Sequence, residues 1–262
     1  PDHLDRHGSM EEYIKMKLNA LINMKHKGQI VYNKDDAILE KVLSPLPHIK
    51  QPFSTKSKDV LYRIDNKNII GPSDDKILEI DELGIPGEHN LQNFLAASTC
   101  SHLMGISQNQ IVRTLKEFKG VEHRLEHVRT INEVEYINDS KATNINSVIV
   151  AINTYDQPIV LILGGFNKGA NFRLLLPHIK SSHVRDIVSY GDAGGQINTA
   201  LGDAVRSVQV TDLSSAVKKA QLMAAPGDIV LLSPGCASYD EFSNFEERGN
   251  HFKSIIKNLA AS

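Results

Sequence analysis

The sequence predicts an α/β protein whose second half is a Rossmann-like, doubly wound and mostly parallel sheet. Short, nearly continuous apolar runs alternate there with helical segments, as parallel strands do when helices cover both faces of their sheet. The apolar runs are "PIVLIL", "RDIVSY", "SVQV" and "DIVLL", and helices are expected at 195–201, 213–224 and 239–260. Ligands bind such sheets beyond the carboxyl ends of the strands, so the loops that follow the strands are where chemistry is expected.

The first half of the chain mixes helices and strands. A capping box that opens at Ser9 begins a helix, and Gly28 ends it. The segments "QIVYN" and "KILEID" are typical of strands, and "DVLYRIDNKNIIGP" predicts a hairpin. A helix with apolar residues at helical spacing is expected from Asn90 to Gly105, and Ser107 caps another.

With 262 residues and 41% hydrophobic content, the chain can bury one large core or two modest ones. We expect two domains, 1–120 and 121–262, because the sequence pattern changes near residue 120. A net charge of −2 without runs of like charge argues against a broad cationic face for nucleic acid. No apolar run reaches the roughly 18 residues of a membrane span. Cys100 and Cys236 match no disulfide or metal spacing, which fits a reducing cytosol. We therefore expect a cytoplasmic protein that binds neither nucleic acid nor membrane.

Three loops of the second half carry polar side chains directly after predicted strands. They are 138–141 ("NDSK"), 164–169 ("GGFNKG") and 233–238 ("SPGCAS"). Parallel strands would bring these loops to one edge, where two lysines, several hydroxyls and close-approach glycines would form a pocket for anions. Helix N-termini expected at Asn144 and Tyr239 would reinforce it. Taken singly, each loop is more typical of a solvated turn, and only the three together make a binding site an equally good interpretation.

Common nucleotide motifs do not match. "GGFNKGAN" has the glycine spacing of a phosphate loop, but Ala170 and Asn171 stand where Lys and Ser or Thr should follow. "GDAGGQ" lacks the spacing of a dinucleotide fingerprint. If ATP binds, its phosphate cradle is expected elsewhere.

Six segments occur in the order and spacing of the Mur ligases, and they cover nearly the whole chain. They are "PDHLDRHG", "GEHNLQNFLAA", "FKGVEHRLE", "INDSKATN", "LILGGFNKGANF" and "LLSPGCASYDEFSNFEERGNHF". The chain resembles this family, and within it the members that add D-glutamate. "NDSKATN" and the terminal segment favour those members, and the D-N-P-R signature of the diaminopimelate-adding members is missing.

The resemblance implies that 1–120 is the latter part of a central ATP-binding domain and that 121–262 is a carboxy-terminal, amino-acid-binding domain. The implied reaction belongs to peptidoglycan synthesis. ATP phosphorylates the carboxylate of UDP-N-acetylmuramoyl-L-alanine, Mg²⁺ shields the crowded charge, and the amine of D-glutamate attacks the acyl phosphate. The family's UDP-binding domain and phosphate loop would precede Pro1. We therefore expect this chain alone to be inactive, and the full-length protein to be a monomer.

ATP and Mg²⁺ are implied to contact residues of both halves. His3 matches a metal ligand, and Lys17 matches a lysine that becomes a carbamate, whose oxygens suit magnesium; both would act in catalysis together with Lys141. The implied nucleotide contacts are Asn90, Asn93, His123, Arg124, Asp139 and Lys141. Without the resemblance, Lys17 is typical of a surface lysine, and Asn90 and Asn93 of helix capping. His3 and His7 also fit zinc, but no third ligand has matching spacing.

D-glutamate is implied to contact the loops of the second half. The matching residues are Thr143, Lys168, Ser238, Tyr239 and Phe245. Lys168 would offer charge to a carboxylate, Ser238 a hydroxyl at a helix start, and Phe245 an apolar wall. By spacing alone, Phe245 is equally typical of helix core.

Two alternatives remain open at the level of sequence. The chain is a non-catalytic product of a truncated gene that keeps a weak binding site, or it belongs to another amide ligase of the superfamily, such as one that adds glutamate to folate. The terminal segment argues against the folate alternative.

Overall fold

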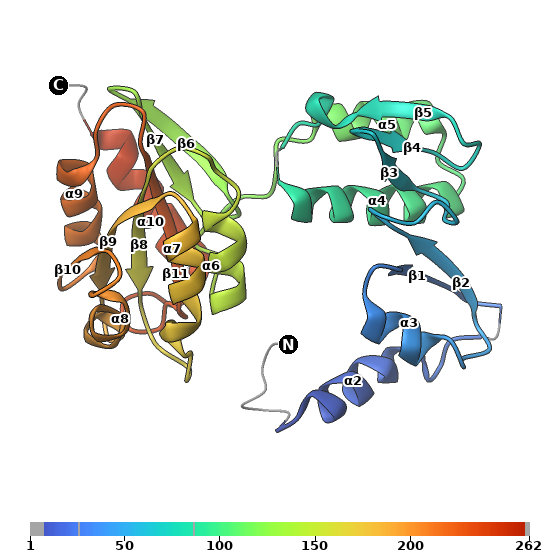
Figure 1. Cartoon of the computed structure of the whole chain (residues 1–262), viewed down its shortest axis with the longest axis horizontal. Coiled ribbons are helices and arrows are strands. Elements are labelled where there is room, and N and C mark those ends of the chain that lie inside the picture. The colour runs from blue at the N-terminus through green and yellow to red at the C-terminus, as the bar shows by residue number, and fades with distance from the viewer. Residues whose placement is uncertain (1–7, 26, 86, 260–262) are drawn as a thin grey trace. The chain divides into compact units, whose positions relative to one another are not determined.

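The structure is a computed structural model that describes residues 8–25, 27–85 and 87–259 (Figure 1). His3 and His7 therefore lie outside the described residues. Two compact units make up the chain, Pro1–Lys119 and Gly120–Ser262. No helix among the described residues is long and apolar enough to cross a lipid bilayer.

The amino-terminal unit begins with helices around a pair of parallel strands. The elements are α2 (Met10–Leu18), the 3₁₀ turn η1 (Asn19–Leu21), β1 (Gln29–Asn33), α3 (Ala37–Leu43) and β2 (Ile49–Phe53). The predicted cap of α2 is confirmed, because Ser9 Oγ accepts a hydrogen bond from the Glu12 amide at 3.2 Å. Helix α2 carries no buried residue among those described. The predicted strand "QIVYN" is β1, and it pairs in parallel with β2, which the sequence reading missed.

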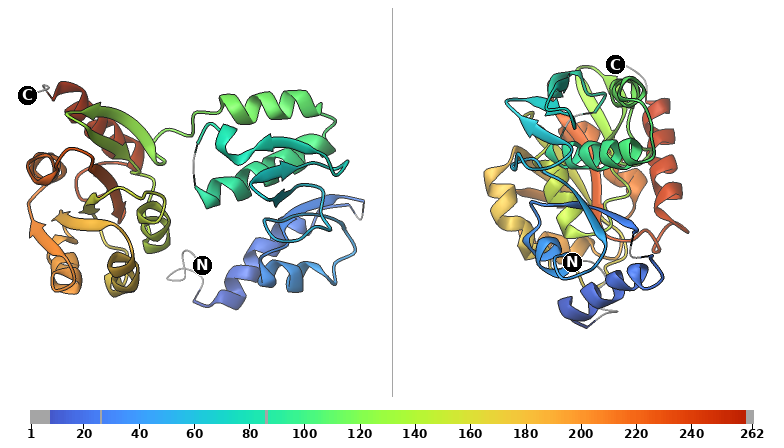
Figure 2. Two further views of the ribbon diagram at one scale, coloured as in Figure 1. Left: turned by 45° about the horizontal axis from the view of Figure 1, so that its top comes forward. Right: turned by 90° about the vertical axis from the view of Figure 1, so that its right-hand side faces the viewer.

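The rest of this unit is an antiparallel sheet with two helices. Its elements are β3 (Arg63–Asp65), β4 (Asn68–Ile70), β5 (Lys76–Glu79), the turn η2 (Ile80–Glu82), α4 (Glu88–Leu103) and α5 (Gln108–Glu117). The predicted hairpin is confirmed: Asn66 and Lys67 take left-handed φ values of 46° and 63°, which a tight hairpin turn requires. Helix α4 packs against β1 and β2, and α5 packs against β5 (Figure 2).

The described residues of the carboxy-terminal unit form a six-stranded sheet in the order β10-β9-β8-β11-β7-β6. The strands are β6 (Glu126–Ile131), β7 (Val134–Asn138), β8 (Ile159–Gly164), β9 (Val184–Tyr190), β10 (Arg206–Gln209) and β11 (Ile229–Gly235). Neighbours pair in parallel except β6, which is antiparallel to β7. The predicted mostly parallel sheet is therefore confirmed.

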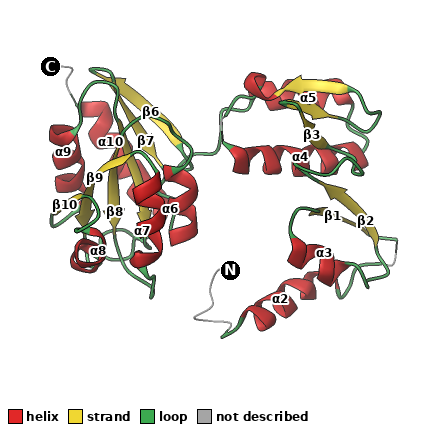
Figure 3. Cartoon of the chain, in the orientation of Figure 1, coloured by secondary structure: helices red, strands yellow, loops and turns green. Residues whose placement is uncertain are grey.

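Helices cover both faces of this sheet (Figure 3). They are α6 (Ile145–Ile152), the turn η3 (Phe172–Leu175), α7 (Leu176–Ser181), α8 (Gly194–Leu201), α9 (Leu213–Met223) and α10 (Phe245–Asn258). The apolar residues of α6, η3, α7 and α8 join one core, and those of α9 and α10 join the core on the opposite face. Strands β8 and β11 are buried along their whole length, which explains their unbroken apolar runs.

One predicted helix start is wrong. The helix expected from residue 239 begins at Phe245, because Asn244 caps it by accepting the Glu247 amide at 2.7 Å. Residues 239–244 form a loop, so Tyr239 does not mark a helix N-terminus and Ser238 does not start a helix. The other predicted N-terminus is confirmed, since Asn144 Oδ1 accepts the Ser147 amide at 2.9 Å.

Candidate functional site

Three loops meet at the carboxyl edge of the six-stranded sheet. Strand β11 lies between β7 and β8, with Leu232 opposite Asn138 and Gly235 opposite Gly164. Hydrogen bonds join the loops beyond these pairs: the Asp139 amide donates to the Leu232 carbonyl at 2.8 Å, and the Gly235 amide donates to the Ala142 carbonyl at 2.8 Å. The prediction that the loops after β7, β8 and β11 lie side by side is therefore confirmed.

Glycine allows two of these loops to approach each other closely. Gly165 has φ +118°, and a Cβ atom added there would lie 2.3 Å from the Ala237 carbonyl oxygen. The next residue, Phe166, exchanges two backbone hydrogen bonds with Ala237, at 2.8 and 3.1 Å. A residue other than glycine at 165 would push the β8 and β11 loops apart.

The Arg248 side chain forms hydrogen bonds to two of these loops, those after β7 and β11. Its guanidinium is fully buried and donates to the Ser140 hydroxyl at 2.9 Å, the Ser140 carbonyl at 2.8 Å and the Cys236 carbonyl at 3.1 Å. None of the ion pairs found among the described residues includes this arginine, and its three hydrogen bonds go to hydroxyl and carbonyl oxygens. Sequence reasoning missed Arg248; the signal was an arginine at an inward position of an otherwise amphipathic helix.

Asp139 is the most perturbed acid of the edge. Its carboxylate accepts hydrogen bonds from the Ser233 hydroxyl at 2.9 Å and from the Leu125 amide at 3.3 Å. Burial nevertheless dominates and raises the pKa of this carboxyl to about 7, against the opposing effect of those bonds and of the Arg124 charge. Asp139 therefore changes protonation near neutral pH.

His123 and Arg124, near the start of the carboxy-terminal unit, differ in their surroundings. His123 is buried: its ring nitrogen Nδ1 lies 3.0 Å from the Asn138 side-chain nitrogen Nδ2, and its ring meets Phe245 edge-on with the ring centres 6.2 Å apart. Arg124 is exposed, and its charge acts on Asp139. The structure thus gives His123 a packing role, whereas Arg124 is free to meet a ligand.

The two loop lysines lie over aromatic rings. Lys141 Nζ is 5.5 Å from the centre of the Phe245 ring, and Lys168 Nζ is 5.1 Å from that of Tyr239. Both lysines are exposed, so their ammonium groups are open to an anion. Ser238, which directly precedes Tyr239 in the sequence, is buried.

Thr143 and Phe245 are partly buried in the same group of loops, and Tyr239 is exposed. The residues predicted to contact D-glutamate therefore all belong to one edge of one sheet. A neighbouring loop residue, Cys236, is no candidate nucleophile, because burial raises the pKa of its thiol to about 12.

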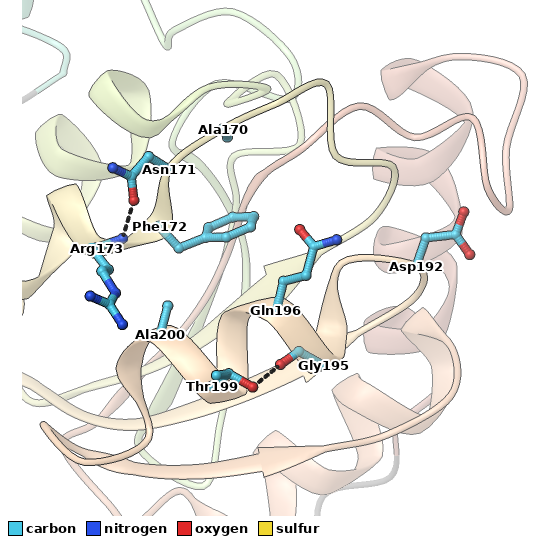
Figure 4. A pocket seen from close by; sticks show the side chains of 9 residues that line it. All are labelled: Ala170, Asn171, Phe172, Arg173, Asp192, Gly195, Gln196, Thr199 and Ala200. Carbon is cyan, nitrogen blue, oxygen red and sulfur yellow. Dashed lines mark hydrogen bonds between the residues drawn. The ribbon is translucent and has the colours of Figure 1, made fainter.

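A hollow of about 630 Å³ lies beside the β8 loop, between η3 and α8 (Figure 4). Phe172, Arg173, Gln196 and Thr199 are among the residues that line it. The Asn167 side chain donates to the Gln196 side-chain oxygen at 2.7 Å and so links this hollow to the loop that carries Lys168. Sequence reasoning did not predict this hollow, because neither segment shows a recognised motif.

The remaining predicted residues belong to the amino-terminal unit. Asn90 is buried in the first turn of α4, and Asn93, one turn further on, is exposed. The Asn33 side chain donates a hydrogen bond to the Gln92 side chain at 3.3 Å, which fixes this end of α4 at the carboxyl end of β1. Lys17 is exposed on α2, with Nζ 5.4 Å from the Tyr13 ring centre. No group of three or more His, Cys, Asp or Glu side chains within the described ranges gathers closely enough to hold a metal ion.

Both units match models of one protein family. Residues 1–101 match the Mur ligase middle domain, and residues 123–236 match the Mur ligase glutamate ligase domain. The chain therefore belongs to the Mur ligase family.

Curated relatives agree with this assignment. A UDP-N-acetylmuramoylalanine–D-glutamate ligase of Clostridioides difficile is 42% identical over 265 residues, which is 98% of this chain and 58% of that protein. One of the same name from Natranaerobius thermophilus is 41% identical over 99% of this chain and 57% of its own length. The chain thus spans a little over half the length of these relatives.

Solved structures show the same fold. A MurF from Acinetobacter baumannii superposes with a TM-score of 0.72 at 16% identity, over 98% of this chain and 57% of that one. MurF ligase from Thermotoga maritima, solved in complex with ADP, gives 0.69 at 15% identity, over 99% and 61%.

Proposed function

We propose that this chain supplies nucleotide and amino-acid sites to an ATP-dependent ligase that joins D-glutamate to UDP-N-acetylmuramoyl-L-alanine in peptidoglycan synthesis. The observation that carries the proposal is the convergence of Lys141, Lys168 and Ser238 at the carboxyl edge of one parallel sheet. The identity of about 40% to ligases of that name supports the choice of amino acid. We also propose that the protein acts as a monomer in the cytoplasm.

The proposed reaction makes two demands on the site. A carboxylate oxygen of UDP-N-acetylmuramoyl-L-alanine attacks the terminal phosphorus of ATP and releases ADP; the amine of D-glutamate then attacks the acyl carbon, loses a proton and displaces phosphate. The first step needs positive charge beside the transferring phosphoryl group. The second needs an anchor for a dicarboxylic amine, which must be held in one orientation for its nitrogen to reach the acyl carbon.

The residues of the edge suit these demands. In the proposal, Asp139 binds the ribose, and Arg124 and Lys141 face the phosphates. The buried His123 ring, held against Asn138 and Phe245, fixes the start of the segment that carries Arg124. Arginine remains charged at any working pH and binds phosphate through two N–H groups at once. Asn90 and Asn93 of the amino-terminal unit are also proposed as nucleotide contacts.

D-glutamate is proposed to bind between the loops after β7, β8 and β11. Lys168 and the hydroxyls of Thr143 and Ser238 would hold its carboxylates, with Tyr239 and Phe245 beside its methylene groups. Phe245 is only partly buried, so part of its ring is available as an apolar wall.

The proposal includes Mg²⁺ only because the sequence resembles the Mur ligases. His3 and Lys17 would bind it, Lys17 after conversion to a carbamate, because an ammonium group is a cation and cannot ligate a metal. The exposure of Lys17 leaves its amine open to carbon dioxide. The ion would shield phosphate charge when bound.

Calorimetric titration of the chain tests the amino-acid site. We expect D-glutamate to bind more tightly than L-glutamate or diaminopimelate, and Lys168→Met to weaken D-glutamate binding roughly tenfold or more, because a charged hydrogen bond is lost. Arg173→Met is the matched control: it removes an exposed cation from the neighbouring hollow and should leave the affinity unchanged.

Turnover by the full-length gene product with ATP and UDP-N-acetylmuramoyl-L-alanine tests the reaction. Absence of a preference for D-glutamate would contradict the proposed substrate. A preference for L-glutamate with a folate acceptor would indicate the folate-adding alternative instead.

A further inference from the structure

One segment of the chain holds the side chains of both site lysines. Tyr239 and Phe245 lie in the stretch between β11 and the first turn of α10, whereas Lys141 and Lys168 come from two other loops. The lysine-to-ring distances of 5.5 Å to Phe245 and 5.1 Å to Tyr239 are within the range of about 6 Å in which a ring face attracts a cation. Each ammonium group is therefore held above an aromatic face.

The backbone that carries Lys168 is fixed independently of its side chain. Phe166 and Ala237 exchange hydrogen bonds on one side of the lysine. On the other side, Asn167 Oδ1 accepts the amides of Gly169 and Ala170 at 2.9 and 2.7 Å. With the backbone held at both ends, the flexible part of the loop is the lysine side chain, which has four rotatable carbon–carbon bonds.

The Tyr239 side chain contributes little to the core. It is 62% exposed, and no hydrogen bond to its hydroxyl is found among the described residues. Its close neighbour is the Lys168 ammonium. A large aromatic ring left in water has weak structural value, whereas the same ring beneath a flexible cation limits where that cation can go.

We propose that Tyr239 is a positioning residue for Lys168. Its ring holds the ammonium group over the site before an acid arrives, so that less conformational freedom of Lys168 is lost when the acid binds. The identity of that acid as a carboxylate of D-glutamate rests on the proposed function. The positioning itself rests only on the ring, the cation and the fixed loop.

Nuclear magnetic resonance of the ligand-free chain tests the positioning directly. The ε-methylene protons of Lys168, identified by loss of their signal in Lys168→Arg, should be shifted upfield by the ring current of Tyr239. Tyr239→Leu should remove this shift, and Tyr239→Phe should keep it. The corresponding signal of Lys141, which lies over Phe245, should not change in either variant and serves as the internal control.

Titration with D-glutamate tests the consequence. Tyr239→Leu should weaken binding by about two- to fivefold, the strength of a cation–π contact at an exposed site, and Tyr239→Phe should restore it. Because the ring is exposed, both variants should unfold at the same urea concentration as the parent chain, which excludes general loss of structure.

The outcomes separate the inference from the proposed function. A Lys168 signal without an upfield shift, or one unchanged in Tyr239→Leu, overturns the positioning role. If Tyr239→Leu loses the upfield shift of Lys168 but binds D-glutamate as tightly as the parent chain, the positioning of Lys168 does not matter for binding. Failure of the parent chain to bind D-glutamate contradicts the proposed function and the assignment of the acid, while the resonance experiment still decides whether Tyr239 positions Lys168.

Discussion

Arg248 shows how a single residue organises the site without facing a ligand. Its three donors reach Ser140 and Cys236, residues from two different loops. A buried cation is costly unless its hydrogen bonds are satisfied, so these contacts both compensate for burial and fix the loops that accept them. The geometry around Lys141 thus depends on a residue far along the chain.

Asp139 predicts a dependence of stability on pH. Its pKa in the folded protein is about 7, above the ordinary value of 3.8, so the folded state holds the proton more tightly than the unfolded chain. Its contribution to stability is fully present below about pH 3.8 and is lost as pH rises through about 7. Asp139→Asn has no carboxyl group to titrate, so its free energy of unfolding should lack this pH-dependent component, which is on the order of 4 kcal/mol for a rise in pKa from 3.8 to about 7.

Urea unfolding of the parent chain and Asp139→Asn between pH 4 and 8 measures this effect. The difference between the two proteins isolates Asp139 from the other titrating groups. A difference in unfolding free energy that stays constant across this range would show that Asp139 is not buried as the structure has it.

Helix α10 illustrates how an element adapts to its neighbours. A glycine in a helix is normally destabilising relative to alanine. At Gly249, however, an added Cβ would lie 2.2 Å from His123 Nδ1, and that ring is buried and cannot move away cheaply. The glycine allows α10 to pass directly over His123.

We therefore predict that Gly249→Ala destabilises the chain by roughly 1–3 kcal/mol, as overpacking does. Gly195→Ala in α8 is the matched control, because the nearest neighbouring atom would be 3.8 Å away. That variant should be neutral or stabilising by up to about 1 kcal/mol. Equal shifts of the urea midpoint in the two variants would contradict the close packing of α10 on His123.

At the scale of the whole molecule, the two units differ in how completely they bury their strands. The residues of β8 and β11 are buried throughout, whereas α2 has no buried residue and β1 pairs only with β2 among the described strands. Opening of a segment is cheapest where little apolar surface is buried. The amino-terminal unit should therefore open first.

Hydrogen exchange followed by mass spectrometry checks this expectation. Amides of β8 and β11 should exchange slowest, those of α2 should exchange within the earliest time points, and heating should reveal a weaker transition in 1–119 before that of 120–262. One cooperative transition with uniform protection in both units would contradict it.

The sequence by itself determined the fold class of the second half, a mostly parallel sheet, and the location of the candidate site at one edge of that sheet. Continuous apolar runs such as "PIVLIL" indicate strands buried on both faces, and parallel strands put the loops of Asn138, Gly164 and Ser233 at one edge. These are local signals with a simple geometric consequence. The lysines of those loops were predicted for the same reason.

Only the tertiary structure decided how these loops are held. The start of α10 is the exception, because the Asn244 cap joins residues only three apart and was a local signal that the sequence reading missed when it began the helix at residue 239. The buried Arg248, the raised pKa of Asp139 and the ring beneath Lys168 arise from residues distant in sequence. Burial and charge environment are properties of packing, so no local pattern of residues encodes them.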